Sequence, residues 1–187
     1  MDVRFLPSEK TQAALTGLAE DCESMQWAVA WATENAAFEA AIKHSAKFRH
    51  LVIGTHLYQT QPRALERVSD LKAAKVMPPT GDLFHPKVYL FRNGQRIRAV
   101  VGSPNLTHGA MTRNIEASVL LDGTDDDKAL TDLCRFVEGA WNGAEDITPA
   151  FLYRYQHQFA AKAAAREDLT KFSYVRPPTN PNTKRAP

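Results

Sequence analysis

Two short apolar runs, separated by a segment with helical spacing, constrain the fold of this chain more than any other feature. WAVAWAT (residues 27–33) and HLVIGT (residues 50–55) are long enough for buried strands and too short for typical helices. Between them, NAAFEAAIKHSAK carries Phe38, Ala41 and Ile42 at helical intervals. Strand, helix and strand in this order predict an α/β fold, in which helices flank a sheet.

Further elements extend this pattern on both sides. Ser8 is expected to cap a helix over residues 9–22, and Thr60 is expected to cap another helix that has Pro62 in its first turn. HPKVYLF and QRIRAVVG predict the two strands of a hairpin that turns at Asn93-Gly94. The remaining predicted elements are strands at residues 75–77 and in NIEASVLLDG, and helices over residues 126–141 and 149–166.

These elements fit one domain over residues 1–170, a mixed β-sheet with helices on both of its faces. The length of 187 residues and the hydrophobic content of 44% suit a single compact core. The end of the chain, residues 171–187, is rich in proline and polar residues. This composition predicts a disordered tail, or a linker that leads to a further domain.

The sequence contains no apolar run long enough to span a membrane, and it begins with MDVRFLPSEK, which lacks the basic-then-apolar order of a secretory signal. Cys22 and Cys134 lie far apart and match no metal-ligand spacing. We interpret them as reduced thiols, with a disulfide or a reactive cysteine as the alternative. We therefore expect a cytoplasmic protein without a membrane partner.

The charge is small overall but unevenly distributed. The formal net charge is +2, yet no acidic residue lies between Asp82 and Glu116. The basic residues in that interval are Lys87, Arg92, Arg96, Arg98 and Arg113. A local basic field is typical of a polyanion site, although arginines of a hairpin are also often simply solvated.

The same interval carries the residues with the clearest chemical potential. His85 and Lys87 form an H-x-K pair, and alternation along a strand would place both side chains on one face. Gly102-Ser103-Pro104-Asn105 then forms a small-residue turn with free backbone N–H groups, which predicts an anion cradle, especially with a helical turn from Pro104. Glu116 follows on the next predicted strand.

Such a set can attack a phosphodiester without a metal or cofactor. A neutral imidazole can attack phosphorus, and a carboxylate on its other nitrogen fixes the tautomer. Lysine and asparagine can orient and neutralise the phosphate oxygens. A second acid must protonate the leaving oxygen, and the chain contains only one H-x-K pair.

These residues resemble the phospholipase D superfamily, in which an H-x-K motif precedes a G-S-x-N turn, and most closely its metal-independent restriction endonuclease branch. The aspartate that usually follows the lysine is absent, because that position holds Arg92. Glu116, eleven residues after Asn105, stands where the nuclease branch keeps a glutamate. The specific likeness covers residues 85–116, and the general order of elements covers residues 27–121.

The resemblance implies a half-site domain that acts as a homodimer, with the active site on the two-fold axis. One histidine forms a phosphohistidine and its mate acts as general acid. The implied substrate is DNA, with RNA as an alternative, in a restriction setting. The implied catalytic residues are His85, Lys87, Asn105 and Glu116. From their positions in the basic segment and in or near the turn, we expect Arg92, Arg98, Ser103 and His108 to contact the substrate.

Other interpretations of the sequence remain open. The chain could hydrolyse a phospholipid, against which the lack of a membrane-binding segment argues, or it could bind nucleic acid without cleaving it. Ser103 could cap a turn, Glu116 could pair with Arg113, and His108 could be a surface residue. For His56 we expect a structural role. For Trp27 and Trp31 we expect packing in the core or at a dimer interface.

Overall fold

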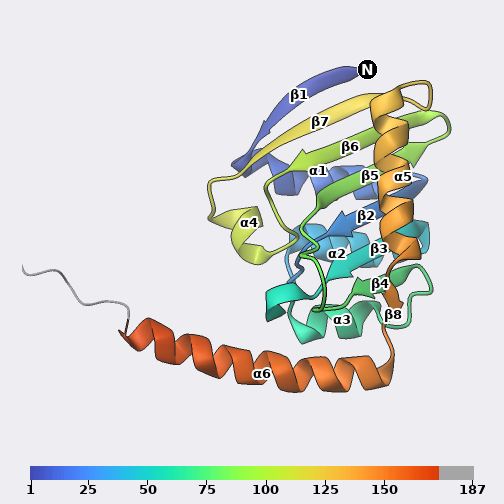
Figure 1. Ribbon diagram of the computed structural model, residues 1–187. Coiled ribbons are helices and arrows are strands. Elements are labelled where there is room, and N and C mark those ends of the chain that lie inside the picture. The colour runs from blue at the N-terminus through green and yellow to red at the C-terminus, as the bar shows by residue number, and fades with distance from the viewer. Residues whose placement is uncertain (173–187) are drawn as a thin grey trace, which may run out of the picture.

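The computed structural model describes the backbone of residues 1–172, and in this part eight strands form one sheet in the order β1-β7-β6-β5-β2-β3-β4-β8 (Figure 1). The strands are β1 (Asp2–Pro7), β2 (Ser24–Val29), β3 (Phe48–Gly54), β4 (Ala74–Met77), β5 (Lys87–Asn93), β6 (Arg96–Gly102), β7 (Ala117–Thr124) and β8 (Glu145–Asp146). β2, β3 and β4 run parallel, and the other neighbouring pairs are antiparallel. The predicted mixed sheet is therefore confirmed.

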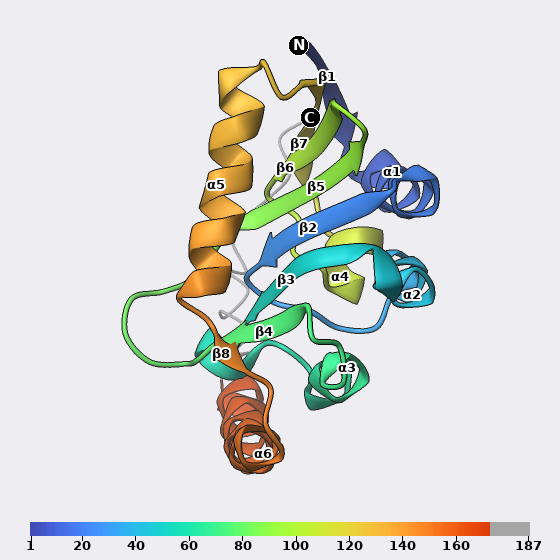
Figure 2. The same cartoon turned by 90° about the vertical axis from the view of Figure 1, so that its right-hand side faces the viewer.

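Helices cover both faces of the sheet, as predicted. The α-helices are α1 (Ser8–Asp21), α2 (Ala36–Lys43), α3 (Pro62–Val68), α4 (His108–Thr112), α5 (Lys128–Asn142) and α6 (Pro149–Phe172), and the 3-10 helices are η1 (Ser45–Lys47) and η2 (His56–Tyr58). Figure 2 shows α1, α2, α3 and α4 on one side of the sheet and α5 on the other, while α6 lies below the β8 edge. The face under α5 is thus the less covered one.

The core has two layers because strand side chains alternate between the faces. The layer under α1 and α2 centres on Trp27, which is fully buried. Its indole packs edge to face against Phe48, Tyr89 and Phe91, at ring-centroid distances of 5.2, 5.2 and 5.8 Å. The layer under α5 is smaller and aliphatic, with Val88, Leu90, Ile97, Ala99, Leu130 and Val137 among its members.

Some local predictions were wrong. Neither Ser8 nor Thr60 caps a helix with its side chain. The Ser8 hydroxyl instead bonds to the backbone of Glu116, and the Thr60 hydroxyl joins the Gly54 carbonyl to the Ala32 amide. In both cases a distant strand end or loop offers a partner that sequence spacing does not reveal.

The bounds of some predicted elements also differ from the structure, and two strands were missed. β1 and β8, the two edge strands, were not predicted, and β2 ends at Val29, before Trp31. α6 continues past residue 170 to Phe172, and residues 173–187 of the predicted tail lie outside the described residues. Within the described part, no helix has the length and apolar character of a membrane span.

Candidate active site

His85 and Lys87 lie in direct contact at the start of β5. His85 is in the exposed segment that leads into the strand, and Lys87 is its first residue, with 8% of its surface exposed. The Lys87 Nζ lies 2.8 Å from His85 Nδ1, 2.9 Å from Nε2 and 3.1 Å from the backbone oxygen of His85. The two side chains therefore lie together, although His85 precedes the strand on which both residues were predicted to lie.

The surroundings of this pair favour a neutral imidazole. Partial desolvation lowers the pKa of His85, and the positive charge of Lys87 lowers it further. Burial also lowers the pKa of Lys87, although the charge of Glu116 opposes this shift. A histidine with a lowered pKa keeps a free lone pair at neutral pH, which a nucleophile or base requires.

Glu116 is fixed on both its backbone and its carboxylate. Its amide donates to the Ser8 hydroxyl at 2.6 Å, and that hydroxyl donates to the Glu116 carbonyl at 2.8 Å. Its carboxylate accepts from the Ser103 hydroxyl and from Asn114 Nδ2 at 2.9 Å. Among the described residues, no hydrogen bond joins Glu116 to His85, so the carboxylate acts on this pair through its charge at Lys87.

Ser103 supports Glu116 and the start of β7. Its hydroxyl accepts from the Ala117 amide at 3.0 Å, and its own amide donates to the Ala117 carbonyl at 2.9 Å. A Cβ on Gly102 would lie 2.3 Å from the Ala117 oxygen, which explains the glycine at this position. Ser103 therefore positions Glu116 rather than capping a turn.

Asn105 presents an unsatisfied group beside this turn. Its Oδ1 is buried and has no hydrogen-bond partner among the described residues. The preceding Pro104 carbonyl accepts a bond of 3.0 Å from Tyr89 Oη, which holds the turn against β5. No helical turn starts at Pro104, since α4 begins at His108, with the Thr107 hydroxyl as its cap. A buried polar atom without a partner is costly and often marks a functional site.

The segment after β2 connects the loop that carries His85 with the turn that carries Asn105. The Ala30 amide donates to the Pro86 carbonyl at 2.8 Å, next to His85, and the Thr33 amide donates to the Leu106 carbonyl at 2.9 Å, next to Asn105. Trp31 lies between these anchors, with its ring centroid 4.9 Å from that of His85. The sequence assigned Trp31 only to packing, and its position beside the H-x-K pair was not predicted.

The arginines that were predicted to contact the substrate do not lie beside the H-x-K pair. Arg92 lies five residues along β5 from Lys87, about 16 Å at ~3.3 Å per residue, and forms an ion pair with Asp125. Arg98 bonds to Asp21 and Asn93, and Arg96 pairs with Asp122. Acids from elsewhere in the chain thus balance the basic hairpin, and we propose no substrate contact for its arginines.

His108 is exposed at the start of α4, three residues after Asn105. Its backbone amide donates to the Thr33 hydroxyl at 2.8 Å. No side-chain bond connects it to His85 or Glu116 within the described residues.

Cys22 and Cys134 are free thiols whose pKa values are raised by burial, which favours the predicted unreactive state.

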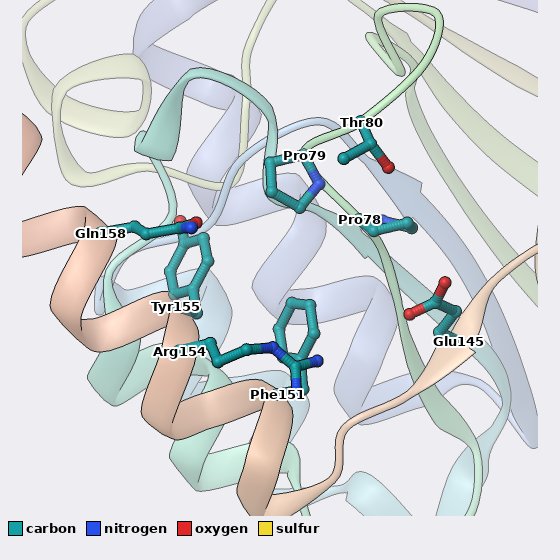
Figure 3. Close-up of a pocket in the computed structure, with 8 residues that line it drawn as sticks. All are labelled: Pro78, Pro79, Thr80, Glu145, Phe151, Arg154, Tyr155 and Gln158. Atoms are coloured by element: carbon teal, nitrogen blue, oxygen red, sulfur yellow. The ribbon is translucent and has the colours of Figure 1, made fainter.

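Two adjoining hollows of about 610 and 560 Å³ lie beside His85, on the α5 side. Phe136 of α5 and His85 line both hollows, and Leu83 and Ser103 line one each. A separate hollow of about 280 Å³ lies between α6, β8 and the end of β4, and His85 is not among its lining residues (Figure 3). The hollows beside His85 are the ones that a substrate or partner of the H-x-K pair could occupy.

Solved structures with the same fold include known phospholipase D family members. Nuc from Salmonella typhimurium has a TM-score of 0.64 and 16% identity, over 78% of this chain and 95% of that one. NucT from Helicobacter pylori has a TM-score of 0.58 and 14% identity, over 78% and 98%. Phosphatidylserine synthase from Haemophilus influenzae Rd KW20 has a TM-score of 0.57 and 11% identity, over 90% and 44%.

The sequence itself also matches a family. No curated protein shows significant similarity to the chain. However, the profile of the NgoFVII restriction endonuclease N-terminal PLD domain matches residues 17–142, which include the H-x-K pair, the turn and Glu116. This match covers more than half of the chain. The protein therefore belongs to the NgoFVII restriction endonuclease N-terminal PLD domain family, within the phospholipase D superfamily.

Proposed function

We propose that this protein is an endonuclease that hydrolyses DNA phosphodiester bonds without a metal ion, through His85, in a site shared by two copies of the chain. The observation that carries the proposal is the contact between Lys87 Nζ and the exposed His85 imidazole, whose pKa is lowered by desolvation and by the charge of Lys87. Membership of a restriction endonuclease family supports DNA as the substrate.

The proposed reaction has two displacements at phosphorus. In the first, a ring nitrogen of the neutral His85 of one copy forms a bond to phosphorus, and the bond from phosphorus to the leaving sugar oxygen breaks. The His85 of the second copy, which starts as the protonated imidazolium, gives that oxygen its proton. In the second, water attacks the phosphohistidine, the bond between nitrogen and phosphorus breaks, and the second imidazole takes the proton from water. Both histidines return to their starting states.

The neighbouring groups have matching roles in this reaction. When substrate binds, the Lys87 ammonium would give up its contact with the His85 ring and bind a phosphate oxygen instead. It would then stabilise the charge that develops on that oxygen. The Asn105 amide, with its unsatisfied Oδ1, would turn its NH₂ group toward another phosphate oxygen. Glu116, held by Ser103 and Ser8, would keep Lys87 charged despite its burial.

A second copy is needed because one chain supplies one such imidazole. The two hollows beside His85 together form a groove in which the second copy could bind. Two apolar side chains in this groove, Phe136 and Leu83, are 48% and 54% exposed. Phe136 belongs to α5, which lies on the opposite side of the sheet from α1, α2, α3 and α4 (Figure 2). A symmetric interface across this groove would bring two copies of His85 to the same axis.

The shared site is tested by mixing wild-type protein with His85→Ala protein in excess chelator. If both histidines are needed, an equal, randomly paired mixture should retain about a quarter of the cleavage rate of undiluted wild type. A site contained in one chain would retain about half of that rate, and this result would contradict sharing. Pairing is checked by native mass spectrometry with two tags. Cleavage that requires an added metal would contradict the mechanism.

The interface is tested by Phe136→Glu, which places a charge in the apolar groove. We expect this variant to be monomeric at concentrations where the wild type is dimeric, and to lose cleavage in parallel. The matched control is Tyr153→Glu on α6, because Tyr153 is 64% exposed and lines neither hollow beside His85. Analytical ultracentrifugation compares the masses. A dimeric Phe136→Glu protein would show that the copies pair elsewhere.

A further inference from the structure

We propose that Trp31 is a positioning residue that holds the imidazole of His85 and the ammonium of Lys87 in their reactive arrangement. This inference rests on the proposed function, because it assigns a task within the same site. It concerns a residue outside the H-x-K pair, the turn and Glu116, and the evidence is the set of contacts around its ring.

The Trp31 indole contacts both members of the pair. Its ring meets the His85 ring edge to face, at a centroid distance of 4.9 Å and an interplanar angle of 66°. The Lys87 Nζ lies 5.7 Å from the Trp31 ring centroid, within the range of a cation–π attraction. Trp31 therefore restricts the rotation of the imidazole and attracts the ammonium that bonds to it.

The indole is in turn fixed by a separate loop. Trp31 Nε1 donates to the backbone oxygen of His56 at 2.9 Å. His56 is buried, and its Nε2 lies 3.3 Å from the Thr80 oxygen, while its Nδ1 is buried with no partner among the described residues. These contacts define the position of the carbonyl that receives the indole N–H.

The backbone after His56 has an unusual conformation. Leu57 and Tyr58 have φ values of 59° and 52°, in the left-handed region that residues other than glycine rarely adopt. Such strained backbone persists where the surrounding structure determines it and is frequent at functional sites. Here the strained backbone turns the chain directly after His56, whose carbonyl orients Trp31.

The expected consequence concerns the attack step rather than substrate binding. A ring nitrogen must point at phosphorus within a narrow angle, and misplacement of about 1 Å can cost ~100-fold in rate. Trp31 contacts the attacking ring and no group that we assign to phosphate except Lys87. Loss of the indole should therefore lower kcat and leave KM nearly unchanged.

The decisive experiment is NMR titration of the His85 imidazole without substrate, in wild-type, Trp31→Leu and Trp31→Phe proteins. Desolvation lowers the pKa of His85, so removal of the indole should hydrate the ring and raise that pKa toward its ordinary value. The ring protons of His85 should also lose the ring-current shift. Trp31→Phe keeps an aromatic face and should restore most of both signals.

Activity measured on the same proteins should follow these signals. We expect kcat to fall about 10- to 100-fold in Trp31→Leu, with KM within about twofold of wild type, and to recover partly in Trp31→Phe. The matched control is Trp141→Phe, because Trp141 stacks on His50 at 5.1 Å and has Lys75 4.5 Å from its ring centroid. It should shift the His50 resonances and leave those of His85 unchanged.

The two parts of the experiment separate the inference from the proposed function. If the His85 shifts and pKa are the same in Trp31→Leu and wild type, the inference is wrong, whatever the activity does. If they change as expected but the wild type does not cleave DNA, Trp31 does position His85 and the proposed function is wrong. A fall in kcat without any change at His85 would also overturn the inference.

Discussion

His85→Ala should lower the rate of DNA cleavage by about 10³-fold or more, because under the proposed mechanism the variant has neither a nucleophile nor a general acid. His85 is exposed and lies outside the helices and strands, so its removal should leave the fold intact. Cleavage of a labelled duplex in excess chelator measures the rate, and circular dichroism verifies the fold.

The control for this prediction is His157→Ala, which removes an exposed histidine from α6. Its side chain packs against Tyr153, at a ring-centroid distance of 4.5 Å, and the substitution should leave the rate unchanged. A His85→Ala protein that cleaves at more than about a tenth of the wild-type rate would exclude His85 as the nucleophile. If wild-type protein binds DNA tightly and never cleaves it, the chain is a binding module.

Trp27→Ala should lower the free energy of unfolding by about 3–5 kcal/mol, the largest loss that we expect from one core substitution. Trp27 is fully buried and contacts three aromatic rings, so alanine would leave a cavity that the surrounding strands cannot fill. Urea unfolding monitored by circular dichroism measures the change. A loss below about 1.5 kcal/mol would mean that the core closes around the smaller side chain.

Trp27→Phe is the informative companion to this variant. The Trp27 Nε1 is buried and has no hydrogen-bond partner among the described residues, so the wild-type core already carries the cost of an unsatisfied donor. Phenylalanine removes that donor and keeps an aromatic ring. We expect a much smaller loss than for alanine, because the gain from removing the donor offsets part of the lost packing.

The sequence predicts the central strands well because their patterns are local. β3 and the β5–β6 hairpin follow from buried apolar runs and from Asn93-Gly94, where Gly94 adopts the expected positive φ of 52°. β1 was missed because DVRFLP mixes charged and exposed residues, as expected of an edge strand. β8 has two residues, too few to give a pattern.

In the candidate site too, the sequence reveals local contacts and misses distant ones. The pairing of His85 with Lys87 follows from a spacing of two residues, so the sequence could reveal it. The support of Glu116 by Ser8, and the approach of Trp31 to His85, depend on contacts across 108 and 54 positions. The arginines of the hairpin appeared free in the sequence, because their acidic partners lie on other elements.

The bond between Ser8 and Glu116 has a consequence for the order of folding. It joins residues 108 positions apart, and β1 pairs with β7 beside it, so its formation costs more chain entropy than the formation of a local contact does. The contact of His85 with Lys87, in contrast, is available to a short piece of chain. A nascent or misassembled chain can therefore carry the reactive pair while its carboxylate is still unplaced. In the proposed mechanism, the complete site would therefore form later than its pair of histidine and lysine.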